Sequence, residues 1–368
     1  MDSNNENAAL LEQRKTEHID LCETQDVEAT SATTLLEQVH LLHHSLPELD
    51  DADLSTSVEF LGRHQALPWV IVGMTGGATR AQDINRRLAA FAQQHGLAMG
   101  LGSQRAMLRN PELARTYQVR DVAPDILLFG NIGAVQAAQS PTTEIADLVA
   151  TVGANALCVH LNPAQELIQE HGDRSFRGCM EAINRLQQEL PVPVIVKETG
   201  CGMSPAVLAM LRRHHVRAVD VSGAGGTTWT GVETLRARGA HEVLGRTFWD
   251  WGIPTAVSTI WAAEAGFEVI ASGGVRSGMD AVRALAAGAR LAGAALPFLR
   301  ALADGGEPAL NTLLEEWNLT LRTALMLTGS ATPADLAWAP RVMGPELQRW
   351  LNPVTPVRPP RPTGFGRS

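Results

Sequence analysis

Residues 268–288 read EVIASGGVRSGMDAVRALAAG, and this stretch decides the fold. It starts with a short apolar run, passes through a glycine-rich turn and continues with a helical pattern. A run that is apolar at nearly every position predicts a strand buried on both faces. The stretch therefore predicts one strand–helix unit of a parallel α/β fold.

The same unit recurs along the chain, because seven further apolar runs precede turns of the same kind. The eight predicted strands cover Trp69–Met74, Leu97–Gly100, Ile126–Gly130, Ala156–Leu161, Pro193–Lys197, Ala218–Ser222, Glu268–Ser272 and Arg290–Ala294. Eight such units favour a (β/α)8 TIM barrel. The alternative is an open doubly wound sheet, but no GxGxxG motif follows the first strand.

Composition and charge limit the function classes. The 368 residues carry 30 Lys and Arg against 39 Asp and Glu, and the net charge of −9 argues against broad binding to nucleic acid or anionic membrane. No apolar run is long enough to span a membrane, and the polar first residues lack the features of a secretion signal. The four cysteines form no CxxC pair. They indicate reduced thiols in a cytoplasmic protein without a zinc site or disulfide framework.

The predicted organisation is one domain over residues 14–351 with a tail at each end. Residues 1–13 are polar and predict a disordered tail, and residues 352–368 are rich in Pro and Arg and predict an extended one. The longest step between predicted strands is the one between the sixth and the seventh. This step predicts a lid or binding loop, which we place over residues 229–249.

Residues 35–44 read LLEQVHLLHH and predict a helix. His40, His43 and His44 would then have a spacing that metal ligands use. No acidic residue stands at a matching position, so the pattern favours a solvated helix face over a metal site.

Polar side chains follow several predicted strands, at the end of a barrel where active sites lie. Lys197 ends the otherwise apolar fifth strand, where its charge could lie beside an anionic cofactor ring or could reach water. Groups suited to hydrogen-bonding a cofactor follow four other strands, although each alone is typical of a turn; they are Thr75, Ser103, Asn131 and Thr227. The loop over 272–278 favours phosphate binding, because its glycines expose backbone N–H groups and a helix N-terminus follows.

The segment after the fourth strand, HLNPAQE, has the densest set of polar groups. His160 can bind or protonate an anion, and Asn162 and Gln165 offer neutral hydrogen bonds. Glu166 can hold magnesium, which binds through one or two carboxylates plus substrate phosphate. The alternative is an ordinary helix start with an acidic residue in its first turn. Glu233 is a further candidate carboxylate, whose position alone indicates a surface residue.

A basic cluster, RKTEH, lies inside the acidic N-terminal segment. Its Arg14, Lys15 and His18, together with Arg105 after the second strand, could bind a diphosphate. On its own, the cluster is typical of a solvated basic patch.

Taken in order, these motifs resemble the type 2 isopentenyl-diphosphate Δ-isomerase family. The matching segments are RKTEH (14–18), MTGG (74–77), GSQR (102–105), NIG (131–133), HLNPAQE (160–166), VKETGCG (196–202), VDVSGAGGTTW (219–229), WGIPT (251–255) and ASGGVRSGMD (271–280). HLNPAQE and GAGGTTW are the specific motifs, whereas SGGVRSG is shared with many phosphate-binding barrels.

The resemblance implies an FMN-bound barrel that interconverts isopentenyl and dimethylallyl diphosphates by adding and removing protons at the reduced flavin. It also implies magnesium, NADPH as the reductant, and a homo-oligomer, either a tetramer or an octamer.

The resemblance also implies roles for individual residues. Gln165, Lys197 and His160 would be catalytic, and Glu166 would ligate magnesium. The substrate would contact Arg14, Lys15, Ser103, Gln104, Arg105, His160, Asn162 and Gln165. FMN would contact Met74, Thr75, Gly76, Ser103, Asn131, Lys197, Ser222, Thr227, Gly273, Gly274, Val275, Ala294 and Ala295.

Two other functions remain as alternatives. An FMN-dependent 2-hydroxyacid oxidoreductase would share the barrel, the lysine and the phosphate loop, but it needs a histidine base after the sixth strand, where this chain reads SGAGGTTW. A non-catalytic flavin-binding barrel would not need the HLNPAQE and RKTEH segments.

Overall fold

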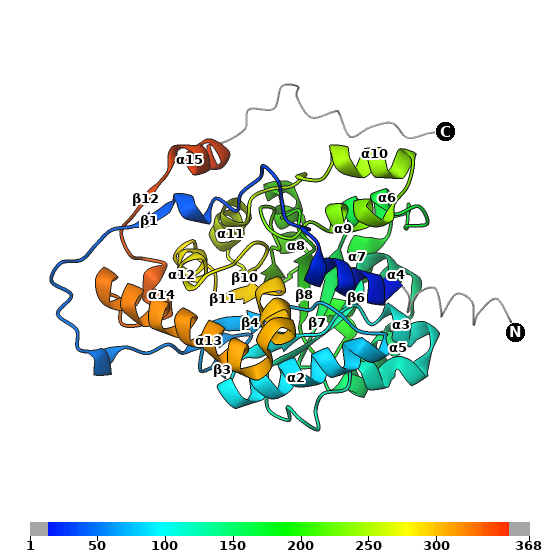
Figure 1. The fold of residues 1–368 in the computed structure, drawn as a ribbon, viewed down its shortest axis with the longest axis horizontal. Coiled ribbons are helices and arrows are strands. Elements are labelled where there is room, and N and C mark those ends of the chain that lie inside the picture. Colours follow the sequence, from blue (N-terminus) through cyan, green and yellow to red (C-terminus); the bar gives the residue numbers. More distant parts are fainter. Residues whose placement is uncertain (1–13, 353–368) are drawn as a thin grey trace, which may run out of the picture.

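Eight parallel strands close into a barrel in a computed structural model that describes residues 14–352 (Figure 1). Around the barrel, the strand order is β10-β11-β4-β5-β6-β7-β8-β9. The strands are β4 Trp69–Ile71, β5 Ala98–Gly100, β6 Leu128–Gly133, β7 Ala156–Leu161, β8 Val194–Glu198, β9 Ala218–Asp220, β10 Glu268–Ala271 and β11 Leu291–Ala294. Each overlaps one predicted apolar run, so the predicted TIM barrel is confirmed.

The barrel interior is a packed core with a plug at one end. Small and branched side chains from all eight strands fill it, among them Val70, Ala98, Ile195 and Ile270. Phe60 belongs to the same buried cluster and lies edge-to-face with Phe129 at 6.1 Å between ring centroids. Phe60 comes from an antiparallel hairpin, β2 Val58–Phe60 and β3 Arg63–Gln65. The hairpin therefore closes the interior with an aromatic side chain.

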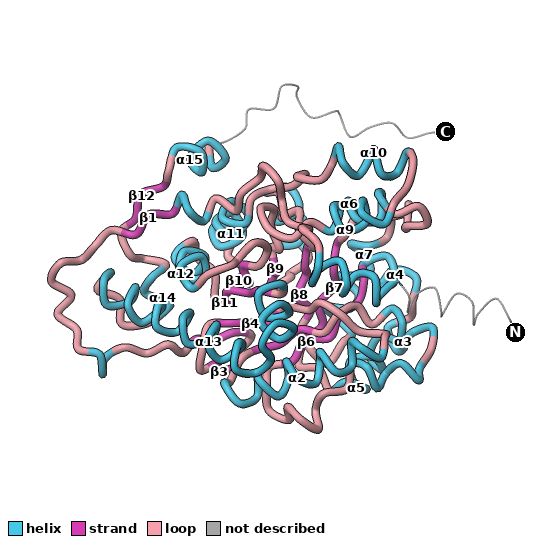
Figure 2. The backbone as a smooth tube through the Cα atoms, in the orientation of Figure 1, coloured by secondary structure: helices cyan, strands magenta, loops and turns pink. Residues whose placement is uncertain are grey.

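Helices surround the barrel, as the tube view shows (Figure 2). They are α2 Thr79–His95, α3 Arg105–Arg109, α4 Ala134–Gln139, α5 Thr142–Val152, α6 Pro163–Ile168, α7 Cys179–Glu189, α8 Pro205–Arg213, α9 Trp229–Arg236, α10 Ala240–Thr247, α11 Thr255–Glu264, α12 Gly278–Ala286, α13 Leu296–Thr328, α14 Pro333–Leu336 and α15 Pro345–Leu351. Short 3-10 turns are η1 Leu36–Gln38, η2 Asp51–Asp53 and η3 Pro111–Thr116. Buried apolar stripes fix these helices; Trp317 of α13, for example, packs edge-to-face on Trp69 of β4. No helix within 14–352 is long and apolar enough to cross a membrane.

The predicted helix over residues 35–44 is wrong. Leu35 has a φ of 55°, which ends any helical path before η1. The chain then forms β1 Val39–Leu41, which pairs antiparallel with β12 Arg341–Met343. Tertiary pairing with a distant strand overrides the local pattern. The three histidines of this segment are exposed and form no metal cluster with other described residues.

The predicted lid loop over residues 229–249 is largely helical, since α9 and α10 occupy most of it. Thr228 caps α9 by accepting a hydrogen bond from the N–H of Gly231 at 3.2 Å. The predicted tails, 1–13 and 352–368, lie outside the described residues except for residue 352.

An N-terminal arm, residues 27–34, follows a helix over residues 14–24 and lies against the loop after β9 (Figure 1). Ala29 N–H donates to the Gly226 carbonyl at 2.8 Å. Asp250 accepts hydrogen bonds from the backbone and hydroxyl groups of Thr30 and Ser31 at 2.5 to 2.8 Å. These contacts hold the N-terminal helix over one end of the barrel.

Candidate functional site

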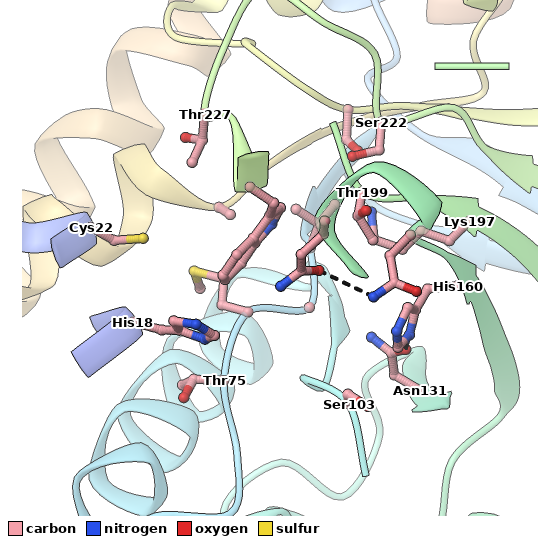
Figure 3. Close-up of a pocket in the computed structure, with 18 of the residues that line it drawn as sticks. His18, Cys22, Thr75, Ser103, Asn131, His160, Lys197, Thr199, Ser222 and Thr227 are labelled. Atoms are coloured by element: carbon pink, nitrogen blue, oxygen red, sulfur yellow. Dashed lines mark hydrogen bonds between the residues drawn. The ribbon is translucent and has the colours of Figure 1, made fainter. Parts of the chain in front are cut away.

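A pocket opens at the carboxyl ends of the barrel strands, and side chains from nearly every strand end point into it (Figure 3). Most of the predicted site residues line it: Arg14, Lys15, Met74, Thr75, Ser103, Arg105, Asn131, His160, Asn162, Gln165, Glu166, Lys197, Ser222, Thr227, Gly273, Gly274, Ala294 and Ala295. The N-terminal helix adds His18, Ile19 and Cys22. The structure thus brings together residues that lie up to 281 positions apart in the sequence.

One side of the pocket concentrates cationic groups. Arg14 and Lys15 come from the N-terminal helix, and Arg105 begins α3 after β5. Burial lowers the pKa of Lys15 to about 8, and the charges of Arg14 and Arg105 act in the same direction. Burial also lowers the pKa of Arg14. Within the described chain, the Nε atoms of both arginines are buried without a hydrogen-bond partner. This side of the pocket is therefore suited to an anion with several oxygens.

His160 lies on β7 between this cationic side and the barrel interior. Its Nδ1 is 2.8 Å from Asn131 Oδ1, and Asn131 Nδ2 donates to the Leu101 carbonyl at 3.0 Å. The second contact orients the amide, so its oxygen accepts a hydrogen bond from the Nδ1–H group of His160. Burial lowers the pKa of His160 to about 3, with further contributions from Lys15, Lys197 and Arg105. The imidazole is therefore neutral at neutral pH, and it would need an anionic ligand to take up a proton.

A buried carboxylate, Glu233 of α9, adjoins the pocket. Gln165 Nε2 and Gln169 Nε2 donate to its Oε1 at 3.0 and 2.6 Å, and His18 Nε2 lies 3.0 Å from the same oxygen. Burial opposes ionisation of Glu233, but the contact with His18, the hydrogen bond from Gln165 and the charge of Arg236 together outweigh it, and the pKa of Glu233 falls to about 2. The sequence-based placement of Glu233 on the surface is wrong, because α9 packs against α6 and removes this side chain from water.

Glu166 lies in the first turn of α6 and is buried, with 6% of its surface exposed. Its Oε2 accepts the N–H of Asp173 at 2.7 Å, and its Oε1 accepts Asn162 Nδ2 at 3.0 Å. The described residues contain no group of three or more His, Cys, Asp or Glu that could hold a metal ion. Any cation bound by Glu166 would therefore need further ligands of another kind, such as water or the oxygens of a bound anion.

Lys197 ends β8, and a carboxylate holds its ammonium group. Its Nζ donates to Asp220 Oδ2 at 2.5 Å, and Ser272 Oγ donates to Asp220 Oδ1 at 2.5 Å. The neighbouring Glu198 turns away from the pocket and accepts the backbone N–H groups of the next four residues. This contact fixes the turn that carries Thr199 into the pocket.

Glycines shape the opposite side of the pocket. Gly273 and Gly274 have φ angles of 94° and 73°, which other residues rarely adopt. A Cβ atom on Gly274 would come within 2.3 Å of Thr34, and one on Gly226 within 2.2 Å of Gly274. Arg276 also lines the pocket; its Nη2 donates to Thr227 at 3.1 Å and its Nε donates to Glu28 at 3.1 Å. The loops after β9 and β10 thus pack closely and expose backbone to the pocket.

Three predicted site residues do not line the pocket. Gln104 was predicted to bind substrate, but it is fully buried and its amide bonds to Asn131 N–H and the Leu148 carbonyl. Gly76 packs against the ring of Tyr117, and Val275 is fully buried. These three residues pack beneath the strand ends and do not face the pocket.

The structure also adds residues that sequence reasoning did not place at the site. They are Gln136, Gln169, Thr199, Trp229 and Arg276. Thr199, Trp229 and Arg276 lie within motifs noted in the sequence, so the position of those motifs after predicted strands could have placed them at the site. Gln136 lies in α4 and Gln169 directly follows α6, and neither belongs to such a motif.

The chain is similar to known proteins in sequence and in fold. The profile described as FMN-dependent dehydrogenase matches residues 134–340. The isopentenyl-diphosphate delta-isomerase of Synechococcus sp. is 48% identical to this chain in sequence, and the match covers 89% of this chain and 94% of the relative. The protein of the same name in Nostoc sp. is 44% identical, with coverage of 88% and 93%. The protein of that name in Methanothermobacter thermautotrophicus is 43% identical (93% and 96%). A structure of mandelate oxidase with (S)-2-phenylpropionate gives a TM-score of 0.61 at 19% identity over 92% of this chain and 98% of that one. This last likeness shows the fold alone.

Proposed function

This chain belongs to the isopentenyl-diphosphate delta-isomerase family, and on that premise we propose that it interconverts isopentenyl and dimethylallyl diphosphates with the help of FMN and magnesium. The observation that carries the proposal is that one pocket has two chemically different sides. A cationic side suits a diphosphate, and a glycine-lined side suits the phosphate and ring of a flavin.

The diphosphate would lie between the N-terminal helix and the strand ends. Arg14, Lys15 and Arg105 offer several N–H donors, and the unpartnered Nε atoms point to a ligand that accepts them. Neutral His160 adjoins the same charges, and a bound anion would raise its pKa from about 3. These groups would hold the charged end of the substrate and leave its hydrocarbon end near Gln165.

The residues present fit FMN. Gly273 and Gly274 line the pocket with backbone alone, so their N–H groups can approach a phosphate. Thr75 Oγ1 is buried with no hydrogen-bond partner among residues 14–352. Gly273, Gly274 and Thr227 would hold the phosphate, while Asn131 and Lys197 would contact the ring. When reduced, the flavin supplies a proton donor and acceptor at N5 beside the substrate.

The protein residues would bind and orient the substrate. Moving a double bond adds a proton to one carbon and removes one from another, with no net oxidation. Glu233 has a pKa of about 2, so it is ionised at neutral pH and does not serve as an acid there. Gln165 donates to Glu233 at 3.0 Å, and this bond fixes its amide toward the pocket. Its role is therefore to position the alkene.

We assign magnesium to Glu166, which would bind it together with oxygens of the diphosphate. One carboxylate plus substrate phosphate is a usual way for proteins to bind this ion. NADPH as the reductant and a tetrameric or octameric assembly complete the proposal. The partner is a small-molecule diphosphate, without nucleic acid or membrane.

Anaerobic turnover of the purified protein tests this function. The visible spectrum should show flavin, and NADPH, magnesium and isopentenyl diphosphate should yield dimethylallyl diphosphate. Flavin without this product, or flavin reduced by a 2-hydroxy acid, would refute the isomerase assignment and favour the oxidoreductase alternative.

A further inference from the structure

The loop between α6 and α7 places Asp173 between two groups that the proposed function uses separately. Its carboxylate Oδ2 lies 3.3 Å from Arg105 Nη1 and accepts Gln136 Nε2 at 2.8 Å. Its backbone N–H donates to Glu166 Oε2 at 2.7 Å. One residue thus contacts the arginine assigned to the diphosphate and the carboxylate assigned to the cation.

We propose that Asp173 is a positioning residue that aligns Arg105 with Glu166, so that a diphosphate and a divalent cation bind as one unit. The inference rests on the proposed function and adds a residue that neither touches the reacting atoms nor belongs to the motifs noted in the sequence.

The side chain of Asp173 orients the guanidinium. Arginine is long and loses considerable rotamer entropy when it is fixed, so a preset orientation favours bidentate binding of phosphate. The bond from Gln136 holds the Asp173 carboxylate, and this carboxylate holds one terminal nitrogen of Arg105. Arg105 Nε, which has no hydrogen-bond partner in residues 14–352, remains for an anion.

The backbone of Asp173 orients the carboxylate of Glu166. With Oε2 bonded to this N–H and Oε1 bonded to Asn162, both oxygens have fixed positions and each keeps a lone pair for a cation. Gly172 lets the loop that carries the Asp173 N–H come close to Glu166, because a Cβ atom at position 172 would lie 2.0 Å from the Glu166 carbonyl oxygen. Outer contacts of this kind commonly tune metal affinity.

The competing explanation is that Asp173 only neutralises Arg105. In that case its negative charge opposes the incoming diphosphate, and removing the charge strengthens anion binding or leaves it unchanged. The positioning role predicts the opposite, namely weaker binding, with the larger loss when magnesium is present.

Asp173→Asn tests the side chain, because it keeps the shape and the backbone N–H but removes the charge. We expect the dissociation constant of inorganic pyrophosphate, measured by calorimetry on the FMN holoenzyme with magnesium, to rise about 10-fold. The KM for isopentenyl diphosphate should rise similarly, with kcat within about 3-fold and flavin content unchanged. Asp147→Asn, on the exposed face of α5, is the matched control and should behave like the wild type. Equal or tighter pyrophosphate binding by Asp173→Asn would overturn the proposal, as would a loss of kcat at unchanged KM.

Gly172→Ala tests the backbone contact and decides the matter if the first variant does not fold. The added methyl group should displace the N–H from Glu166 and raise the magnesium concentration needed for half-maximal pyrophosphate binding about 5-fold, with little change in its absence. An unchanged magnesium dependence would refute the alignment of the two groups. Failure of the proposed function would show differently, as a wild-type protein that makes no dimethylallyl diphosphate.

Discussion

The lowered pKa of Lys15 predicts that substrate affinity falls as the pH rises from 7 to 9. A lysine with a pKa of about 8 is about 90% protonated at pH 7 and about 10% protonated at pH 9. If only the ammonium form binds the diphosphate, the dissociation constant rises about 10-fold over this range. Burial lowers the pKa of Lys15 in the free protein and a bound anion raises it, so affinity is nearly full at pH 7, about half of that at pH 8, and falls further above pH 8.

Calorimetric titration of the oxidised holoenzyme with isopentenyl diphosphate and magnesium measures this dependence without turnover. Lys15→Arg is the informative comparison, since arginine keeps its charge to a much higher pH. The variant should show a nearly flat profile over the same range, and ionisation of the substrate itself cancels because both proteins bind the same ligand. Equal slopes for wild type and variant, or a flat wild-type profile, would refute the reasoning.

Four further outcomes follow from the geometry. Gln165→Ala should lower kcat by about 100-fold and retain FMN, as judged from the visible spectrum, since it removes the amide that we propose to orient the alkene; full activity would contradict that role. Gly274→Ala should lose most of its flavin, because the new Cβ would collide with Thr34 and the backbone φ of 73° disfavours alanine. A wild-type ratio of flavin to protein would exclude Gly274 from the proposed phosphate site. Glu166→Gln should require more magnesium for half-maximal activity, and an unchanged magnesium titration would remove Glu166 from the metal site. The pKa of Glu233 falls from 4.5 to about 2, which corresponds to about 3 kcal/mol of stability that is present above pH 4.5 and lost as the pH falls toward 2. Glu233→Gln should lack this part of the pH dependence of unfolding, and acid denaturation with the same pH dependence as the wild type would contradict the contribution of Glu233.

The barrel could be predicted from the sequence because its strands are buried on both faces. Each strand is therefore a nearly continuous apolar run, and the polar residues after it gather at one end of the barrel. Lys197 and Gly273 could be placed at the pocket from this rule alone, and the structure puts both in its lining.

The parts that could not be predicted depend on contacts between distant segments. Glu233 is buried because α9 packs against α6, and His18 and Gln165 contact it from other elements; no local pattern encodes these contacts. Residues 39–41 form a strand only because residues 341–343 supply the partner. Gln104 follows a strand like its neighbours, but its side chain turns inward, and the sequence gives no sign of that direction.

The N-terminal arm has a consequence for how the protein is made. Residues 14–34 leave the ribosome before the barrel strands, yet Asp250, the partner of Thr30, is synthesised 220 residues after it. Arg276 and Arg300, which contact Glu28, emerge later still. The segment that carries Arg14 and Lys15 therefore cannot dock until most of the barrel has been translated. During synthesis the nascent chain can build its barrel strands before the pocket is complete, and residues 14–34, although made early, are among the last to reach their native contacts.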